Sequence, residues 1–499
     1  MKRVTFVLLI FILSPYFSYT QAGYEIILNL NKSKDTIAYL TYYQFDKTFI
    51  KDTCFTAKNG KIIFKGKSKL DTGIYSIVSQ QKTIYFDFFV DEQNQKLEFN
   101  NEKEPDNIQG LFALNSPSQS NFIDYLKFVS KQNINFINYK NSLILKDKKD
   151  TLLLVEKQKE IEKEITIYEK DFYTKNKSSF IGNVVNFKIE KILENVPNAS
   201  NGRPDSLMVY SYYKKHYWDN VNFKVNETMK NPFFYNKLKK YFETVIVQNP
   251  DSISVELDRI LEKTEKGSDL NKTLLAHFIN YYETSKIMGF DKVFVHLSDA
   301  YLKKGEGAGI YNDESVIDSI IKRADLLKPL LVGSVAPELY LIQAKDFAVI
   351  NKMGFNDVKD STDVTNKYYA NVDEINKMFL TLQSVTSDYI ILVFWDVDCG
   401  HCQTEIPKLL AVYNDLIKQG KNVKVISVYT MHDGEKFLNY TIKNGLTNWT
   451  NVYDGVYINN LINKYDVYST PVIYILDSKK KILAKKIGVE QVKDIINFK

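Results

Sequence analysis

Two of the chain's three cysteines are separated by only two residues, in the sequence Cys399-Gly400-His401-Cys402. Thiols at this spacing can form a disulfide with each other, exchange it with another protein, or ligate a metal. A zinc site needs two further ligands, and the sequence contains no second C-x-x-C and no H-x-x-x-H. Covalent haem attachment needs a histidine directly after the second cysteine, where Gln403 stands. We therefore expect thiol-disulfide chemistry with no metal and no cofactor beyond the Cys399–Cys402 dithiol or disulfide.

The cysteine motif stands between a predicted strand and a predicted helix. Residues 389–395 form a near-continuous apolar run, typical of a strand buried on both faces. The apolar residues between Ile406 and Ile417 share one helical face. A thiol at a helix N-terminus meets free N–H groups and the positive end of the helix dipole, which stabilise a thiolate. We expect Cys399, the first and more exposed thiol, to be the nucleophile and Cys402 to resolve the mixed disulfide.

Two further features accompany the cysteines. His401 lies between them, and its protonated form would favour the Cys399 thiolate and make the disulfide more oxidising. About seventy residues later, Thr470-Pro471 precedes the apolar strand predicted for residues 472–476. A proline at the entrance to a buried strand is unfavourable unless it belongs to a special turn. Taken alone, an ordinary proline at the start of a strand is as plausible here.

The predicted elements that position this site form one α/β domain over residues 331–499. A strand, a helix and a second strand at residues 422–429 are followed by a hairpin at residues 472–487 and a last helix at 489–496. One stripe of an amphipathic helix is formed by residues at steps of four, three and four, namely Ile161, Ile165, Tyr168 and Phe172. A further helix is predicted from about Leu270 to Met288, and residues 116–330 are predicted to form a mostly helical domain. Residues 23–115 contain short alternating runs, with Asn59-Gly60 as a tight turn, and are predicted to be all-β. The fold class is therefore multidomain, α/β and α+β.

Composition supports a globular protein of several domains. A length of 499 residues corresponds to roughly three domains. The net charge of +6 comes from interspersed residues of both signs, which argues against a nucleic-acid-binding protein. Three cysteines exclude a disulfide-rich scaffold, since they can form only one intrachain bridge. We expect Cys54 to be a small buried apolar residue of a β-segment.

The first twenty-two residues have the pattern of a secretory signal peptide. Lys2 and Arg3 precede a short apolar run, and Thr20-Gln21-Ala22 supplies the small residues of a cleavage site. No later stretch approaches eighteen uninterrupted apolar residues, so we expect no stable membrane span after cleavage. The predicted location is the periplasm or cell envelope of a Gram-negative bacterium.

Residues 333–499 resemble the thioredoxin superfamily, and most closely its exported TlpA/ResA-like thiol-disulfide oxidoreductases. The resemblance rests on Phe394-Trp395, the cysteine motif, Glu405-Ile406-Pro407, and Thr470-Pro471 with the hairpin and helix that follow. It implies that Pro471 is cis, that Thr470, Pro471 and Trp395 bind the substrate, and that Glu405 moves protons near the thiols. It also implies a thioredoxin fold, protein disulfide or dithiol substrates, and a membrane or periplasmic electron donor.

Three positions depart from the family pattern. Val393 stands where thioredoxin has a buried aspartate, so that proton acceptor is missing. Asp398 replaces the tryptophan that usually precedes the first cysteine, and its charge opposes thiolate formation. His401 replaces the usual proline, as in disulfide isomerases. The expected activity is reduction of disulfides in envelope proteins. A disulfide oxidase or isomerase remains open, as does a binding protein in which the thiol pair is secondary.

The residues before the α/β domain also have a familiar pattern. Residues 24–114 resemble an uncharacterised β-rich domain that precedes thioredoxin domains in exported Bacteroidetes proteins, chiefly through the predicted hairpin around residues 60–66. Residues 120–325 resemble a helical domain of unknown function that has the same neighbours, through segments such as His216-Tyr217-Trp218-Asp219. Neither resemblance implies an activity.

Overall fold

The computed structural model describes residues 23–30, 33, 35–55, 57, 60–143 and 148–498. The predicted signal peptide and Asn59 of the predicted turn lie outside these residues. The chain divides into two compact units, one of residues up to 246 with 263–270, the other of residues 247–262 with those from 271 onward. This division lies inside the helical segment predicted as one domain over 116–330.

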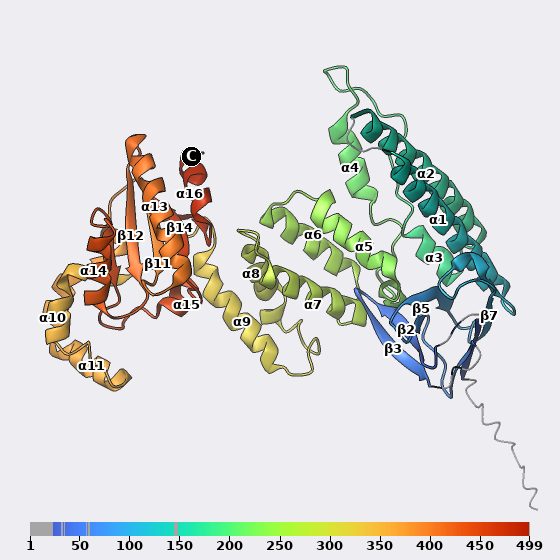
Figure 1. Cartoon of the computed structure of the whole chain (residues 1–499), viewed down its shortest axis with the longest axis horizontal. Coiled ribbons are helices and arrows are strands. Elements are labelled where there is room, and N and C mark those ends of the chain that lie inside the picture. The colour runs from blue at the N-terminus through green and yellow to red at the C-terminus, as the bar shows by residue number, and fades with distance from the viewer. Residues whose placement is uncertain are drawn as a thin grey trace, which may run out of the picture. The chain divides into compact units, whose positions relative to one another are not determined.

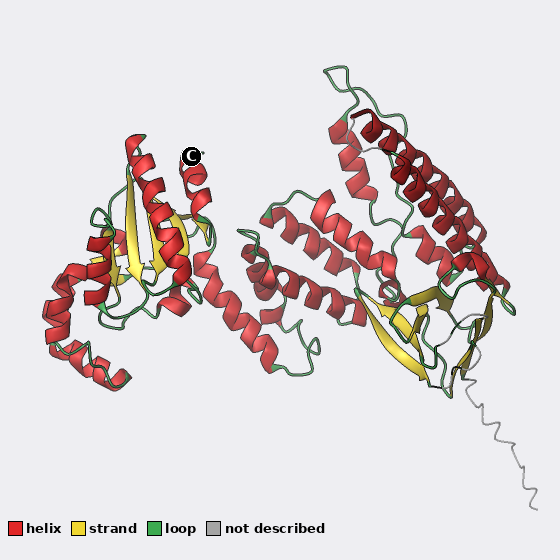
Figure 2. Cartoon of the chain, viewed as in Figure 1, coloured by secondary structure: helices red, strands yellow, loops and turns green. Residues whose placement is uncertain are grey.

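The first unit begins with two four-stranded sheets, as the alternating pattern predicts (Figure 2). Their strand orders are β4-β1-β7-β8 and β3-β2-β5-β6. Buried residues of both sheets, such as Ile26 and Ile77, belong to one apolar cluster, so the sheets pack against each other. The strands are β1 (Tyr24–Leu30), β2 (Ala38–Gln44), β3 (Lys47–Cys54), β4 (Lys61–Gly66), β5 (Gly73–Ser79), β6 (Ile84–Val90), β7 (Lys96–Asn101) and β8 (Leu111–Ala113).

Helices cover the outer face of the second sheet. Ile74 of β5 and Phe89 of β6 share an apolar cluster with Phe122, Phe172 and Val185 from three helices. Phe172 belongs to the helical stripe predicted from the sequence and is buried. The helices of this unit are α1 (Pro117–Ser142), α2 (Lys148–Lys175), α3 (Phe180–Asn186), α4 (Ser206–His216) and α5 (Pro232–Lys240), which continues as one π-helical segment (Tyr241–Val245).

The second unit begins with four helices that precede the α/β domain: α6 (Pro250–Lys263), α7 (Asp269–Thr284), α8 (Asp291–Ala300) and α9 (Ser315–Leu327). The sequence predicts that the helix starting near Leu270 continues to Met288, and this is wrong, because α7 ends at Thr284. Ile287 and Met288 are exposed, so burial of their apolar side chains does not stabilise a further helical turn. Gly289, with φ +88°, instead belongs to the turn that leads into α8.

The α/β domain contains a seven-stranded sheet of order β10-β9-β13-β12-β11-β14-β15. β11 lies inside the sheet, between β12, to which it is parallel, and β14, to which it is antiparallel. The predicted strand-helix-strand unit, hairpin and last helix are all present, whereas the elements around β9, β10, β13 and α14 are not predicted. The strands are β9 (Tyr340–Gln343), β10 (Leu380–Thr381), β11 (Tyr389–Trp395), β12 (Val423–Tyr429), β13 (Thr450–Tyr453), β14 (Val472–Asp477) and β15 (Ile482–Lys485). The helices are α10 (Phe347–Lys352), α11 (Ser361–Ala370), α12 (Val372–Met378), α13 (Gly400–Lys418), α14 (Gly434–Lys443), α15 (Leu461–Tyr465) and α16 (Val489–Asn497).

Strand β11 has a different apolar core on each side, which explains its near-continuous apolar sequence. Ile391 and Val393 pack with residues of α13, α14 and α16, whereas Leu392 and Phe394 pack on the opposite face with Tyr465 of α15. Figure 1 shows α13 and α16 on the same side of this sheet. The predicted fold class, an all-β region, a helical middle and a C-terminal sheet covered by helices, is confirmed.

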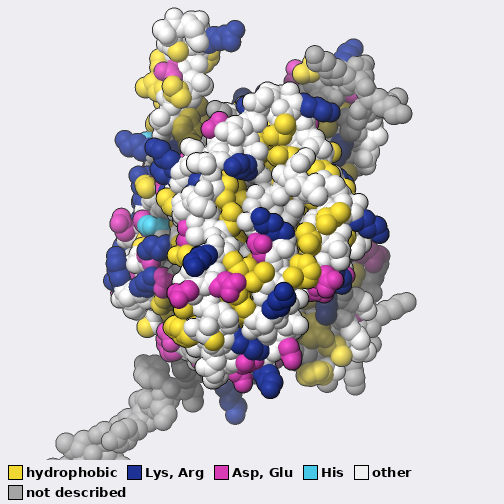
Figure 3. Space-filling view, turned by 90° about the vertical axis from the view of Figure 1, so that its left-hand side faces the viewer, with side chains coloured by type: hydrophobic (Ala, Val, Ile, Leu, Met, Phe, Trp, Pro, Cys, Tyr) yellow, Lys and Arg dark blue, Asp and Glu magenta, His cyan; other side chains and the backbone are white. Residues whose placement is uncertain are grey.

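The surface bears both kinds of charge. On the face of the α/β domain turned toward the viewer in Figure 3, Lys and Arg side chains lie among Asp and Glu side chains and apolar groups. Among the residues that the structure describes, no helix is both long enough and apolar enough to cross a membrane.

Candidate active site

Strand β11 and helix α13 bring the cysteine motif to one edge of the sheet. β11 ends at Trp395 and α13 begins at Gly400, leaving a short connecting turn. The Asp396 carbonyl accepts a hydrogen bond from the Cys399 N–H at 3.3 Å, and its carboxylate accepts one from the Asp398 N–H at 3.0 Å. These bonds fix Cys399 as the N-cap residue of α13, in agreement with the sequence prediction.

The Cys399 sulfur contacts backbone groups from two parts of the chain. It accepts a hydrogen bond from the Cys402 N–H at 3.4 Å, which belongs to the first turn of α13. Its own S–H donates to the Thr470 carbonyl at 3.5 Å. This second contact forms because β14 runs antiparallel beside β11 and starts at the same edge of the sheet. The Thr470–Pro471 peptide bond is cis, which confirms the expectation drawn from the family resemblance.

The two thiols differ in exposure and in acidity. Both are free cysteines; Cys399 is half-buried, and Cys402 is fully buried. Burial acts to raise the pKa of the Cys399 thiol, but hydrogen bonds with the Thr470 side chain and with the backbone of Cys402 and His401 outweigh it and leave this pKa below its ordinary value. Burial raises the pKa of the Cys402 thiol to about 11. The exposed thiol is therefore the one that ionises more readily.

The structure places the other two predicted catalytic residues on α13. His401 is exposed between the cysteines. The carboxylate of Glu405 is 15% exposed and pairs with Lys408 Nζ at 2.7 Å. Among the described residues, neither thiol forms a hydrogen bond with Glu405. The structure therefore places His401 on the exposed side of the cysteine pair. Glu405 forms an ion pair with Lys408 and not a hydrogen bond with a thiol.

Asp398 has a partner that sequence reasoning missed. Its exposed carboxylate pairs with Lys436 Nζ of α14 at 2.5 Å. The negative charge that Asp398 brings beside Cys399 is thus opposed by a neighbouring positive charge. The two residues are 38 positions apart, and no spacing in the sequence links them.

Trp395 does not have the substrate contact predicted for it. Its side chain is fully buried, and its Nε1–H donates to Ser427 Oγ of β12 at 2.7 Å. The rings of Phe437 and Tyr440 of α14 lie edge-on to it, with centroids at 5.6 and 5.5 Å. The prediction is wrong because the alternation of β11 directs this residue into the core beneath α13 and α14, and not toward the surface.

Tyr440 is a second residue of the site that the sequence did not indicate. Its ring covers Trp395, and burial together with the charge of the nearby Cys402 thiolate raises the pKa of its phenol. Tyr440 therefore lies on the buried side of the cysteine pair. It belongs to α14, a helix that the sequence reading did not assign.

The remaining cysteine does not belong to the thiol site. Cys54 is buried in the core between the two N-terminal sheets, at the end of β3, as expected for a small apolar residue. Over the described ranges, no group of three or more His, Cys, Asp or Glu side chains is placed to hold a metal ion.

Comparison with known proteins identifies the C-terminal domain. Residues 387–482 match the family model described as thioredoxin-like. A domain of a possible thiol-disulfide isomerase from Cytophaga hutchinsonii is 30% identical; the match covers 34% of this chain and 93% of that one, with a TM-score of 0.26. Through this domain, the chain belongs to the thioredoxin-like family. The sheet edge that carries Cys399, Cys402 and Thr470 is thus an edge of the thioredoxin-like domain.

Other proteins and one further family model also match parts of the chain. Residues 147–306 match a domain of unknown function, DUF5106, within the segment that resembles a helical domain of unknown function. A thioredoxin-like protein from Bacteroides caccae is 16% identical, covering 61% of this chain and 99% of its own, with a TM-score of 0.42. A thiol-disulfide oxidoreductase from Bacteroides fragilis is 20% identical, covering 33% and 98%, with a TM-score of 0.24. No curated protein matches the chain.

Proposed function

We propose that the chain is an exported thiol-disulfide oxidoreductase that reduces or exchanges disulfides of envelope proteins through Cys399 and Cys402. One observation carries this proposal. A half-buried thiol with a lowered pKa caps α13, and a fully buried second thiol lies one turn further along the same helix. Such a pair has a nucleophile that solvent and substrate can reach and a partner that they cannot.

In the reducing direction, the Cys399 thiolate attacks one sulfur of a substrate disulfide. The substrate S–S bond breaks, a mixed disulfide forms, and the departing substrate sulfur takes up a proton. Cys402 then loses its proton and attacks the Cys399 sulfur, which breaks the mixed disulfide. The second substrate sulfur leaves and is protonated. The substrate gains two electrons and two protons, and the Cys399–Cys402 disulfide must be reduced again by a dithiol donor of the membrane or periplasm.

The neighbouring groups have separate proposed roles. The backbone at Thr470, beside the cis Pro471, would pair with the substrate chain, because its carbonyl already faces the Cys399 thiol. His401, when protonated, would stabilise the thiolate at the exposed end of α13. Glu405 would help move the Cys402 proton, and its pairing with Lys408 keeps the carboxylate in place on the same helix.

The direction of the reaction is decided by the reduction potential of the cysteine pair. The family resemblance favours reduction, whereas the lowered pKa of Cys399 stabilises the dithiol and thereby favours an oxidase or isomerase. We expect equilibration with glutathione to give a potential below about −150 mV. His401→Gln should lower it further, because a neutral amide cannot stabilise the thiolate. A potential above about −150 mV would exclude the reductase and favour the oxidase or isomerase.

Replacing Cys402 by serine should trap the substrate. Without a resolving thiol, the mixed disulfide between Cys399 and the substrate persists. We expect the full chain with Cys402→Ser, expressed with its export signal, to form covalent adducts that dithiothreitol releases and that mass spectrometry can identify. The double variant Cys399→Ser, Cys402→Ser is the matched control and should form none. Covalent adducts in equal amounts in both variants would mean that Cys54, the cysteine that both retain, forms them, and this would contradict the proposal.

A further inference from the structure

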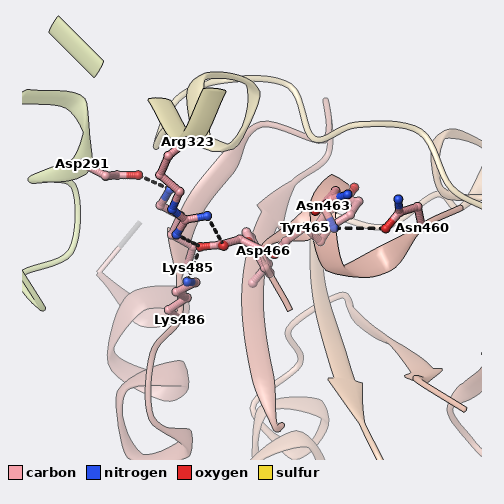
Figure 4. Close-up of polar contacts among 9 residues, drawn as sticks. Asp291, Arg323, Asn460, Asn463, Tyr465, Asp466, Lys485 and Lys486 are labelled. Carbon is pink, nitrogen blue, oxygen red and sulfur yellow. Dashed lines mark hydrogen bonds and ion pairs between the residues drawn. The ribbon is translucent and has the colours of Figure 1, made fainter. Parts of the chain in front are cut away.

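Helix α9 contributes an arginine to a buried carboxylate of the thioredoxin-like domain. The Arg323 guanidinium donates to both carboxylate oxygens of Asp466, from Nη1 to Oδ1 at 2.5 Å and from Nη2 to Oδ2 at 3.0 Å (Figure 4). Lys486 forms a second ion pair with this carboxylate. Only 3% of the Asp466 side chain is exposed. Burial acts to raise the pKa of Asp466, but its bonds with Arg323 and Lys486 hold that pKa below the usual range.

Asp466 begins the segment that leads to Thr470, and Arg323 contacts this segment twice. Besides binding Asp466, the guanidinium lies over the ring of Tyr468, 5.6 Å from its centroid. Tyr468 is 66% exposed, so the arginine is the group that restrains an otherwise open side chain. Two residues further on, the Thr470 carbonyl accepts the hydrogen bond of the Cys399 thiol. A continuous path of contacts therefore leads from α9 to the nucleophile.

The chemistry of arginine explains why this contact can fix the direction of the segment. Asp466 has a φ of +55°, in the left-handed region, where the chain turns sharply after α15. A planar guanidinium that binds both oxygens fixes the plane of the carboxylate, whereas a lysine ammonium supplies charge without that orientation. The Lys486 side chain is 45% exposed and so supplies the second charge from the solvent side. Orientation therefore depends on Arg323.

A second ion pair connects the same parts of the unit at another place. Lys485 of β15 pairs with Asp291 of α8, and both side chains are largely buried (Figure 4). This pair attaches the helices to the thioredoxin-like domain, and among the described residues no hydrogen bond or ion pair joins it to the segment from Asp466 to Thr470. The Lys485 charge interacts with Asp466 only through space. The pair therefore provides a comparison that separates attachment of the helices from positioning of the segment.

We propose that Arg323 is a positioning residue for the thiol site: through Asp466 and Tyr468, helix α9 holds the segment whose Thr470 backbone contacts Cys399. This inference deepens the proposed function, on which it rests, because Thr470 is the proposed contact for the substrate chain. It assigns part of the helical segment before the thioredoxin-like domain to the geometry of the site. Loss of Arg323 should loosen Thr470 and weaken its contacts with the Cys399 sulfur.

The test compares four variants of the full chain: Arg323→Met, Arg323→Lys, Asp291→Asn and Lys322→Met. Lys322 is the exposed neighbour of Arg323 on α9 and is the surface control. The readout is the rate of Cys399 alkylation by iodoacetamide as a function of pH, in the reduced protein. Asp396, Asp398, His401 and Cys402, the titratable residues of the motif and its turn, are unchanged in every variant. Reduction of a peptide disulfide is measured in parallel.

We expect Arg323→Met to move the midpoint of alkylation upward by about half to one pH unit, because the hydrogen bond of the Thr470 side chain, which lowers the pKa of the Cys399 thiol, is weakened. Its rate constant at pH 7 and its kcat/KM for the peptide should both fall about three- to tenfold. Arg323→Lys retains the charge and should fold normally, and its effect should have the same direction and be smaller. Lys322→Met and Asp291→Asn should retain the wild-type midpoint.

Two results would overturn the proposal. An unchanged midpoint in both Arg323 variants would show that the arginine does not act on the site. An equal shift in Asp291→Asn would show that attachment of the helices, and not Arg323, sets the geometry. Failure of the proposed function is recognised separately, because it would appear as a wild-type chain that does not reduce the peptide. Such a chain still gives an alkylation profile, and a midpoint shift confined to the Arg323 variants would still establish that Arg323 positions the site.

Discussion

Serine in place of Cys399 should abolish disulfide reduction by the full chain, lowering kcat/KM at least about a thousandfold. The serine hydroxyl does not ionise near neutral pH, so the backbone groups that stabilise a thiolate at the start of α13 find no anion to bind. The neighbouring structure should remain, because oxygen can still accept the hydrogen bond that the Cys402 N–H now donates to sulfur. Reduction of insulin with dithiothreitol as the donor measures the loss.

The third cysteine supplies the matched control for this substitution. Cys54→Ser changes a cysteine of the N-terminal sheets and should leave the rate of insulin reduction within about twofold of wild type, although the buried hydroxyl lowers stability. Activity that survives in Cys399→Ser would dismiss Cys399 as the nucleophile. The residues before the thioredoxin-like domain would then become the main candidates for function, as in a binding protein with a secondary thiol pair.

Much of the thioredoxin-like domain could be predicted because its signals are local. The apolar run of β11 is continuous because both faces of the strand are buried, and the cysteines follow it directly. The exposure difference between Cys399 and Cys402 follows from their positions at the start and in the first turn of α13. The cis bond at Pro471 could be expected only from the family resemblance, since most X-Pro bonds are trans.

The contacts missed by the sequence analysis join residues that are far apart along the chain. Arg323 meets Asp466 across 143 positions, and Lys436 meets Asp398 across 38. Each of these four residues is of a charged type that is usual on a solvated surface, so nothing in the sequence marks it as part of a contact. Trp395 shows the opposite failure, because its family motif suggested a substrate contact while the alternation of its own strand placed it in the core.

Strand β3 shows why part of the N-terminal region escaped prediction. Its first five residues are exposed, and it forms an edge of its sheet. Because both faces of this edge strand are partly exposed to solvent, its side chains do not have to alternate between apolar and polar. The period-two pattern that identifies β1 and β5 is therefore weak in β3. The two compact units likewise divide within the helical segment, where composition does not change.

The first unit contains a buried lysine with a large expected effect on stability. Lys237 of α5 is 8% exposed, and its ammonium donates to the Phe187 carbonyl at 3.0 Å and lies 4.5 Å from the centroid of the Tyr217 ring. Among the described side chains, no carboxylate lies within 4 Å of it. Burial lowers the pKa of Lys237 from 10.5 to about 8, although the charge of the Glu190 carboxylate acts in the opposite direction. The direct contacts of the ammonium are thus a carbonyl oxygen and an aromatic ring.

Because its pKa is lower in the folded state, Lys237 should make stability rise with pH. Below pH 8 both states are protonated and the folded state carries the full cost of a buried charge. Between pH 8 and 10.5 only the unfolded state remains protonated, so the free energy of unfolding increases, and above 10.5 the cost is gone. The full change is about 3 kcal/mol, of which about 2 kcal/mol falls between pH 7 and 9.5.

Lys237→Met removes this titration, so the stability of the wild type relative to the variant should rise by about 2 kcal/mol from pH 7 to 9.5. Urea unfolding, followed by the fluorescence of Trp218 in a background of Trp395→Phe and Trp449→Phe, reports on the first unit alone. Trp218 is buried beside Tyr217 and therefore senses the same core. Lys239→Met, an exposed position of the same helix, should give a curve parallel to that of the wild type. A parallel curve for Lys237→Met as well would mean that the buried amine retains the pKa of a solvated lysine.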